Sequence, residues 1–158
     1  MNPMTARGLG LGVAVAAWTL ISHLANLPLQ LWPVLVGLGC FLAAGGGISG
    51  LQKSALGSLS GVVWMILYVA ISGALGRNEI LDALLLGGAA VGMVMQTRLP
   101  LLSYTAGAFA GAGTAIGVMG LRAVNWNGGI RVAIMLAIGA GLGYAAEWIS
   151  GMMKTGRG

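Results

Sequence analysis

The sequence has very little charge. Only 7% of its 158 residues are Asp, Glu, Lys or Arg, whereas a typical soluble domain carries roughly 25%. So few charges cannot cover a water-facing surface, which excludes an ordinary soluble domain. Eight Lys and Arg residues against three acids give a formal charge of +5, but they are scattered singly along the chain. Nucleic acid is therefore not an expected partner, because no basic patch is available to bind it.

The residue types that carry most catalytic and metal chemistry are also scarce. The chain has one His, one Cys and three acids, which are spread over its length: His23, Cys40, Glu79, Asp82 and Glu147. No triad, carboxylate pair or metal-ligand cluster can be assembled from so few groups. We therefore expect no enzymatic activity, no catalytic residue, no metal and no cofactor. The single cysteine, Cys40, cannot form an intrachain disulfide and is expected to act as a small buried hydrophobe.

Long apolar stretches are what the sequence has in abundance. No Asp, Glu, Lys or Arg occurs in residues 8–52, 54–76 or 99–121, and shorter gaps cover 83–97 and 132–146. A helix needs about 20 apolar residues to cross roughly 30 Å of hydrocarbon. The pattern predicts an all-α integral membrane protein, with residues 1–158 as one transmembrane domain. Its six hydrophobic helices are expected at about 9–25, 29–45, 57–75, 80–96, 105–120 and 129–149.

The basic residues predict an orientation in the lipid bilayer. If all six helices cross, one side collects Arg7, Lys53, Arg98, Lys154 and Arg157, and the other collects Arg77, Arg122 and Arg131. The positive-inside rule then predicts that both termini are cytoplasmic. In a second arrangement, residues 29–45 and 80–96 are re-entrant hairpins instead of spans. The sequence leaves both arrangements open.

Small residues recur at four-residue spacing on three of the predicted helices. The positions are Gly57 and Gly61; Gly107, Gly111 and Ala115; and Ala133, Ala137, Gly141 and Ala145. Such stripes let helix backbones approach closely in lipid. We therefore predict helix packing through Gly57, Gly61, Gly107, Gly111 and Gly141, and a homo-oligomer that uses the same kind of face.

A shift of 50 residues superimposes part of the sequence on itself. It places Gly57 on Gly107 and Gly61 on Gly111, and each copy runs from an apolar segment through a broken polar stretch into a G-x-x-x-G helix. This pattern predicts an internal repeat of residues 34–66 and 84–116. Chance identity is the alternative, because the chain contains 29 glycines.

Polar side chains gather near the breaks in both copies. A serine or threonine in a helix commonly bonds the carbonyl one turn back, which is the structural interpretation of each one. Taken together, they are candidates for the path of a small neutral polar solute. This candidate transport path consists of Lys53, Ser54, Ser58, Trp64, Ser103, Thr105 and Thr114.

The acidic residues are expected to lie near water. Arg77, Glu79 and Asp82 are predicted to form a solvated loop cluster, because they are close in the sequence between two apolar segments. Glu147 lies inside a late apolar segment, where a carboxylate is a functional candidate by default. Its neighbour Trp148 and its place near the end of the chain favour an interfacial position instead.

Two stretches carry a family resemblance, FLAAGGGISGLQKSALGSLSGVVW at 41–64 and LLSYTAGAFAGAGTAIG at 101–117. They resemble the YcdZ-like family of small bacterial inner-membrane proteins of unknown function (domain of unknown function 1097). The most specific elements are S-G-V-V-W at 60–64 and G-x-F-x-G at 107–111, and Ala106 stands where relatives carry proline. The resemblance implies a multi-pass protein of the bacterial inner membrane and brings no activity with it. A fainter, fold-level similarity is to urea-transporter-type channels, whose N-P signature this chain lacks.

Two functions are compatible with these features. The first is a small channel or facilitative transporter for a small neutral polar solute; mid-membrane titratable groups, which proton-driven transport needs, are missing. The alternative is a structural or accessory membrane subunit without transport activity. If Ser58, Thr105 and Thr114 face one another across a water-accessible crevice, transport is favoured; if they are packed dry, the accessory role is favoured.

Overall fold

The computed structural model describes residues 3–26 and 30–155 of the chain, with side chains over 4–26 and 30–152. The described residues form six α-helices and two short 3-10 turns, which confirms the predicted all-helical class. The helices are α1 Pro3–Leu24, α2 Leu31–Ala43, α3 Gly47–Ala74, α4 Glu79–Met95, α5 Thr105–Met119 and α6 Trp126–Thr155, and the turns η1 Gln96–Arg98 and η2 Pro100–Leu102 connect α4 to α5.

Four of these helices are long and apolar enough to cross a membrane: Met4–Leu24, Gly47–Ala74, Glu79–Arg98 and Trp126–Met152. The two shorter apolar helices are α2 and α5, with 13 and 15 residues, so they extend about 20 and 22 Å at a rise of 1.5 Å per residue. The short elements are therefore the second and the fifth helix. The alternative of a re-entrant hairpin at 80–96 does not match this pattern, because the helix there is long enough to span.

Turn chemistry sets the helix ends. Gly45, Gly46 and Gly47 all have positive φ, at 95°, 74° and 65°, and α3 starts directly after this turn, ten residues earlier than predicted. Asn78 caps α4, because its side-chain oxygen accepts a hydrogen bond from the Ile80 amide at 3.0 Å. Asn125 does the same for α6 by accepting from Gly128 at 2.8 Å. Arg157, which the orientation argument uses, lies outside the described residues, as does the Lys154 side chain.

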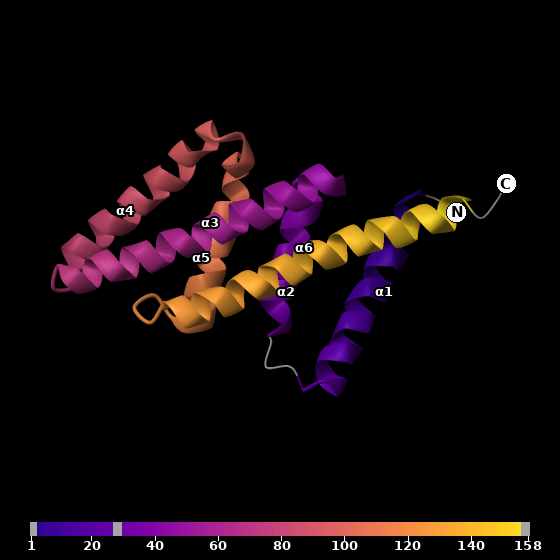
Figure 1. Ribbon diagram of the computed structural model, residues 1–158, viewed down its shortest axis with the longest axis horizontal. Helices are drawn as coiled ribbons and strands as arrows, with labels where there is room; N and C mark the ends of the chain where they lie inside the picture. Colours follow the sequence, from indigo (N-terminus) through magenta and orange to yellow (C-terminus); the bar gives the residue numbers. More distant parts are fainter. Residues whose placement is uncertain (1–2, 27–29, 156–158) are drawn as a thin grey trace.

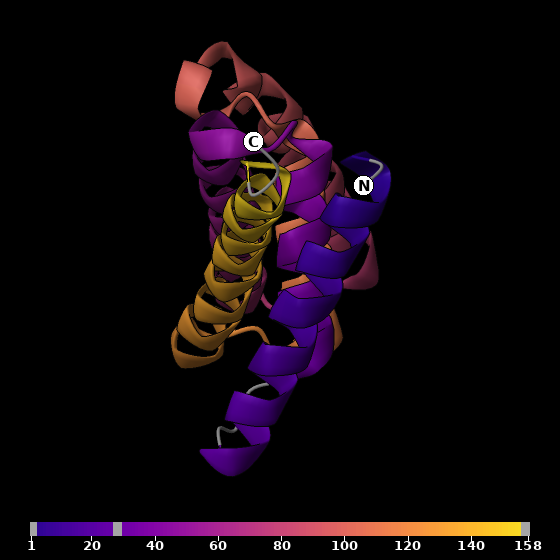
Figure 2. The same ribbon diagram turned by 90° about the vertical axis from the view of Figure 1, so that its right-hand side faces the viewer.

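The helices pack in a two-fold pattern. The most extensive pairs are α3 with α5 and α2 with α6; in addition α1 lies against α6, α4 lies against α3, and α3 crosses α6. In Figure 1, a half-turn about the line of sight brings α1, α2 and α3 approximately onto α4, α5 and α6. The side view in Figure 2 shows α1 running along the bundle beside α6. Each half of the chain thus contributes two helices that are long enough to cross a membrane, with one short helix between them.

Apolar side chains fill the centre where α2, α3, α5 and α6 meet. Phe41, Met65 and Leu136 are among the largest side chains that are fully buried, and Ala108 and Ala115 are equally inaccessible. Many residues on the outside are also apolar, including Leu20, Ile80 and Trp148. An apolar exterior of this kind is expected of a protein that lipid surrounds.

The repeat predicted at a spacing of 50 residues is not confirmed. Residues 34–66 comprise most of α2 and the first part of α3, whereas 84–116 comprise most of α4, the two 3-10 turns and most of α5. A shift of 50 residues would thus match the short helix α2 with the longer helix α4, and the long helix α3 with the short helix α5. The two segments do not occupy equivalent places in the fold.

Candidate functional site

Glycines bring α3 and α5 into backbone contact. A Cβ atom on Gly61 would collide with the carbonyl oxygen of Ala108, and one on Gly111 would collide with the carbonyl oxygen of Ser58. Both colliding groups are backbone, which cannot move aside as a side chain can. The predicted packing residues of these two helices therefore lie at one close helix crossing.

Tyr104 lies at one edge of this crossing. A Cβ on Gly57 would come within 2.8 Å of the Tyr104 carbonyl oxygen, and the Tyr104 ring packs over Gly107. Burial raises the pKa of the Tyr104 phenol above its ordinary value.

The same kind of crossing joins α2 and α6, at different glycines from those predicted. A Cβ on Gly37 would collide with the Leu136 carbonyl oxygen, and one on Gly139 would collide with the Val34 carbonyl oxygen. Gly143 lies against the ring of Phe41. A Cβ on Gly141, in contrast, would meet nothing within 4 Å. The close-packed stripe on α6 therefore runs through Gly139 and Gly143 and not through Gly141.

The hydroxyl groups of the candidate transport path do not converge on an open crevice. Ser54, Ser58 and Thr114 are almost completely buried, at 1%, 1% and 2% exposure. Each donates to a carbonyl of its own helix: Ser54 to Leu51 at 3.2 Å, Ser58 to Ser54 at 2.7 Å, and Thr114 to Ala110 at 2.7 Å. These hydrogen bonds run within one helix, as expected of serine and threonine in a purely structural role. The three hydroxyls are packed without access to water.

The remaining path residues lie apart from these hydroxyls. Lys53 and Ser103 are exposed and Thr105 is half-buried. Trp64 is half-buried and ties α3 to the end of α4: its indole donates to the Gln96 side-chain oxygen at 2.9 Å, and Gln96 donates on to Ser60 at 2.8 Å. By the criterion stated above, this placement favours the accessory role over an open channel.

An ion pair with a buried carboxylate lies at one end of the bundle. Asp82, in the first turn of α4, is only 6% exposed; it accepts a hydrogen bond from Ser72 of α3 and pairs with Arg122 of the α5–α6 connection at 3.3 Å. The prediction that Asp82 belongs to a solvated loop cluster is therefore wrong, although its neighbours Arg77 and Glu79 are exposed. The partner lies 40 residues away in sequence, where no local pattern announces it.

A second ion pair lies at the opposite end. Glu147 of α6 pairs with Arg7 of α1 at 3.4 Å and accepts a hydrogen bond from the Gly47 amide, at the α2–α3 turn, at 2.7 Å. Beside it, Ser150 donates to the Ala6 carbonyl of α1 at 3.1 Å. Each end of the bundle is thus tied by one arginine–carboxylate pair, near a serine of a long helix. The group around Glu147 joins α1, the end of α6 and the α2–α3 turn. The group around Asp82 joins the equivalent elements of the other half, which are α4, the end of α3 and the α5–α6 connection.

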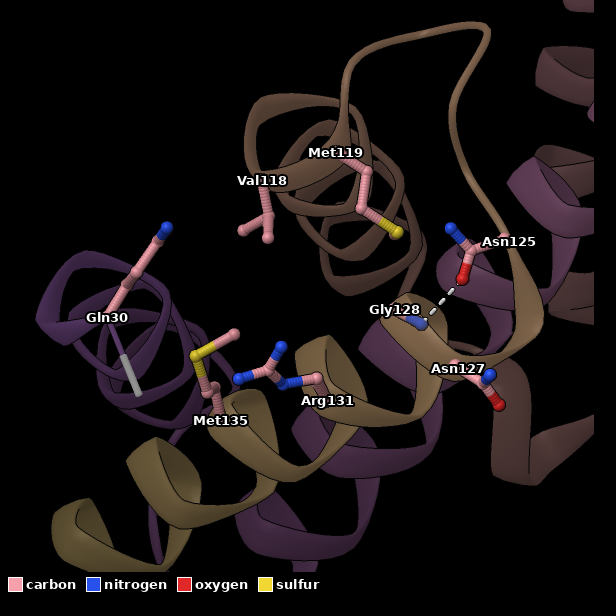
Figure 3. Close-up of a pocket in the computed structure, with 8 residues that line it drawn as sticks. All are labelled: Gln30, Val118, Met119, Asn125, Asn127, Gly128, Arg131 and Met135. Atoms are coloured by element: carbon pink, nitrogen blue, oxygen red, sulfur yellow. Dashed lines mark hydrogen bonds between the residues drawn. The ribbon is translucent and has the colours of Figure 1, made fainter. Parts of the chain in front are cut away.

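The largest of the described cavities, about 410 Å³, opens at the end of the bundle where α2 and α6 begin and α5 ends. Figure 3 shows its walls, which are Gln30, Val118, Met119, Asn125, Asn127, Gly128, Arg131 and Met135. A second hollow of about 350 Å³ surrounds the Arg7–Glu147 pair at the other end. Ser54, Ser58, Thr105 and Thr114 line neither of these two cavities nor the smaller ones beside Glu147 and beside Trp64.

Comparison with known proteins places the chain among membrane proteins of undefined activity. It is 31% identical over 148 residues to "Inner membrane protein YcdZ" of Escherichia coli, covering 93% of this chain and 85% of the relative. It is 34% identical over 122 residues to "Uncharacterized protein YahC" of Escherichia coli (70% and 73% covered), and 32% identical over 123 residues to YcdZ of Salmonella typhimurium (77% and 72% covered). No solved structure matches the chain. The model of a family described as "Protein of unknown function (DUF1097)" matches residues 8–151, so this chain is a membrane protein that belongs to the DUF1097 family.

Proposed function

We propose that this protein is a facilitative carrier for a small neutral polar solute, and that it is neither an open channel nor an enzyme. The observation that carries the proposal is the two-fold arrangement of the helices, in which each end of the bundle is closed by its own arginine–carboxylate pair. The buried, locally bonded hydroxyls argue against a permanently open polar path. A carrier needs no such path, because it opens to one side at a time.

The two-fold arrangement supports an inverted repeat of α1–α3 and α4–α6. Contacts of Gly37 with Leu136 correspond to those of Gly111 with Ser58. Identical glycines also recur where an added Cβ would meet nothing within 4 Å, 76 residues apart at Gly12 and Gly88, 74 apart at Gly39 and Gly113, and 78 apart at Gly73 and Gly151. The tripeptide Ile-Ser-Gly occurs at 48–50, 71–73 and 149–151, and its last two copies lie near the ends of α3 and α6. If all three helices of each half cross, the halves have opposite orientations, as in many secondary transporters.

The ion pairs are suited to act as gates in such a repeat. The Asp82–Arg122 pair joins α4 and α3 to the α5–α6 connection, and the Glu147–Arg7 pair joins α6 and α1 to the α2–α3 turn. Opening one end requires its pair to separate while the other stays closed. Both arginines are more than half exposed, so water can solvate them when a pair opens.

The centre of the bundle favours a neutral solute. The buried residues between the two crossings are apolar or carry hydroxyls, and the described ion pairs lie at the ends. Transferring an ion through such a centre would leave its charge without a partner. With both termini cytoplasmic, as the positive-inside rule predicts, the Glu147–Arg7 pair faces the cytoplasm of an inner-membrane protein. The homo-oligomer remains part of the proposal, and the exposed Gly39 and Gly113 give α2 and α5 flat outer faces for it.

Counterflow in proteoliposomes tests the carrier. Vesicles are loaded with an unlabelled neutral solute, such as urea, glycerol or a short polyol, and diluted into a trace of the labelled form. A carrier concentrates the label transiently inside, whereas a channel lets it only equilibrate. We expect counterflow with wild type and altered exchange with Glu147→Gln and Asp82→Asn, while Ser103→Ala, at an exposed position, matches wild type. Equal traces from empty and protein-loaded vesicles for every solute would refute the proposal.

The second candidate is a structural or accessory subunit, and the dry packing of Ser58 and Thr114 favours it. An accessory subunit would give no counterflow and would co-purify in fixed stoichiometry with a partner membrane protein. Chemical cross-linking in intact membranes followed by mass spectrometry separates these outcomes from a homo-oligomer.

A further inference from the structure

Tyr68 carries a buried hydroxyl group that the two ion pairs do not use. The residue lies on α3 and is only 3% exposed, and its hydroxyl makes no hydrogen bond within the described part of the chain. A buried hydroxyl in this state has lost its bonds to water and gained none in return, which lowers stability. Most buried polar groups of folded proteins are hydrogen-bonded, so this exception needs an explanation.

The Asp82 carboxylate lies beside this hydroxyl. Tyr68 and Ser72 are four residues apart on α3, so they lie on the same face of the helix, and Ser72 donates to one oxygen of Asp82. Tyr68 is close enough to interact with the same carboxylate. The other oxygen of Asp82 pairs with Arg122 at 3.3 Å. The phenol is thus next to an acceptor whose two oxygens are already engaged.

Separation of this ion pair would leave Asp82 without its charged partner. The Arg122 side chain is 58% exposed, so water can solvate it, whereas the Asp82 side chain is only 9% exposed. A buried carboxylate that loses its partner is strongly destabilised unless another donor takes over. A phenol O–H can donate to a carboxylate in a charge-assisted hydrogen bond. Tyr68 has such an O–H beside Asp82, and no described group of the protein accepts from it.

The equivalent place in the other half of the chain has no tyrosine. In the proposed repeat, Ser72 corresponds to Ser150 and Tyr68 to Ala146, 78 residues later in each case. Ser150 donates to two backbone carbonyls, that of Ala146 and one of α1. A phenol is therefore present where the serine bonds a carboxylate, and absent where the serine bonds the backbone.

The carboxylate at the other end of the bundle has different support. Glu147 has a side chain that is 26% exposed, and it accepts the Gly47 amide in addition to pairing with Arg7. Water and a backbone donor can therefore remain with Glu147 when its arginine leaves. Among the described partners of the Asp82 carboxylate, only Ser72 remains when the arginine leaves. A further donor is thus needed at the Asp82 end and not at the Glu147 end.

We propose that Tyr68 is the replacement donor of the Asp82 gate: when Arg122 separates, the phenol O–H takes its place on the carboxylate. Tyr68 is then a positioning residue that acts through Asp82 and does not touch the solute. This inference rests on the proposed carrier function, because it assigns a role in opening one of the gates. The closed state carries the unpartnered hydroxyl and the open state carries the new bond, so the two states become closer in free energy. A small difference suits a carrier, which must populate both states.

A double-mutant cycle in SDS unfolding tests this exchange of donors without any solute. Arg122→Ala removes the guanidinium, and Tyr68→Phe removes only the hydroxyl. With Arg122 present, Tyr68→Phe should change the unfolding equilibrium constant by no more than about twofold, because the hydroxyl it removes has no partner. In the Arg122→Ala background, the same change should raise that constant at least about tenfold, as expected for one hydrogen bond to a charged group. The matched control is Tyr144→Phe, which changes an exposed tyrosine of α6 and should have the same effect in both backgrounds.

Counterflow measures the effect on the gate itself. Tyr68→Phe should slow exchange about tenfold with Arg122 present, although its stability there is unchanged, because the open state alone loses a bond. Arg122→Met, which keeps the aliphatic length without a donor, replaces Arg122→Ala in the unfolding cycle if that variant does not fold.

The outcomes separate this inference from the carrier function. Equal effects of Tyr68→Phe on unfolding in both backgrounds would mean that the tyrosine only fills space, and would overturn the exchange of donors. A tenfold effect in the Arg122→Ala background with unchanged counterflow would overturn the role in gating. Absence of counterflow from wild type would refute the carrier and its gates, while the unfolding cycle would still decide whether the phenol replaces Arg122 on Asp82.

Discussion

Two glycines of α5 allow a sharp test of the close helix crossing. A Cβ on Gly111 would collide with the backbone carbonyl of Ser58 on α3, whereas a Cβ on Gly113, two residues along the same helix, would meet nothing within 4 Å. Replacing glycine by alanine within a helix gains about 1 kcal/mol of intrinsic propensity at either position. Overpacking at a tight contact costs about 1–3 kcal/mol. Because the propensity gain is common to both variants, Gly111→Ala should be about 1–3 kcal/mol less stable than Gly113→Ala.

The crossing has little freedom to relax around a new methyl group. One turn away, a Cβ on Gly61 would collide with the carbonyl of Ala108, so the two backbones touch at two successive levels. Separating the helices at one level opens the other, which should make Gly61→Ala and Gly111→Ala non-additive in combination. The assay is unfolding of detergent-solubilised protein by added SDS, followed by far-UV circular dichroism. If Gly111→Ala and Gly113→Ala unfold at the same SDS fraction, the backbone contact between α3 and α5 is refuted.

Three further predictions use the same unfolding assay. Asp82→Ala removes a buried acceptor and should lower the free energy of unfolding by about 1–3 kcal/mol. Arg122→Gln, which changes a side chain that is 58% exposed, should lower it by less than about 1 kcal/mol. Equal losses of stability in the two variants would contradict the burial of the carboxylate. Ser58→Ala and Thr114→Val should each change stability by no more than about 0.5 kcal/mol and leave solute flux intact, because their hydroxyls bond only their own helices; a loss of flux would restore them to the transport path. Trp64→Phe keeps the ring on α4 but loses the donor to the Gln96 side chain, and a cost near 1 kcal/mol is expected; no cost would mean that this bond does not hold α4 to α3.

Much of the fold could be predicted from the sequence, since long uncharged stretches locate helices in lipid with little ambiguity. All six predicted helices overlap observed ones, and the breaks fall near Gly45, Gly76 and Pro100 as turn chemistry suggests. The start of α3 was missed because Gly47 to Gly57 contains small and polar residues that hydropathy does not mark as helical. In the structure, a residue 100 positions away caps the first turn of α3, because the Glu147 carboxylate accepts a hydrogen bond from the Gly47 amide.

The ion pairs and the cavity could not be predicted for a similar reason. Asp82 looks solvated beside Arg77 and Glu79 in the sequence. The Arg122 that pairs with it lies 40 residues further along, in the α5–α6 connection, and the packing of the helices brings the two together. Gln30 and Arg131 meet at one cavity although 101 positions separate them in the sequence. The recurrence of Ile-Ser-Gly at 71–73 and 149–151 does not single out these ends of α3 and α6, because the same tripeptide also occurs at 48–50.

The sequence identities that suggested a 50-residue repeat have a different physical origin in this fold. Gly57 and Gly61 match Gly107 and Gly111 because the two pairs lie on facing helices of one crossing. A close crossing needs small residues at four-residue spacing on both partners, so interacting helices acquire the same motif without being copies of each other. Duplication should also produce matches at positions where no helix packs against the glycine. At Gly12 and Gly88, Gly39 and Gly113, and Gly73 and Gly151, 74 to 78 residues apart, an added Cβ would meet nothing within 4 Å. In glycine-rich membrane chains, matches on lipid-facing surfaces are therefore better indicators of a repeat than matches between buried motifs, because contact alone explains the latter.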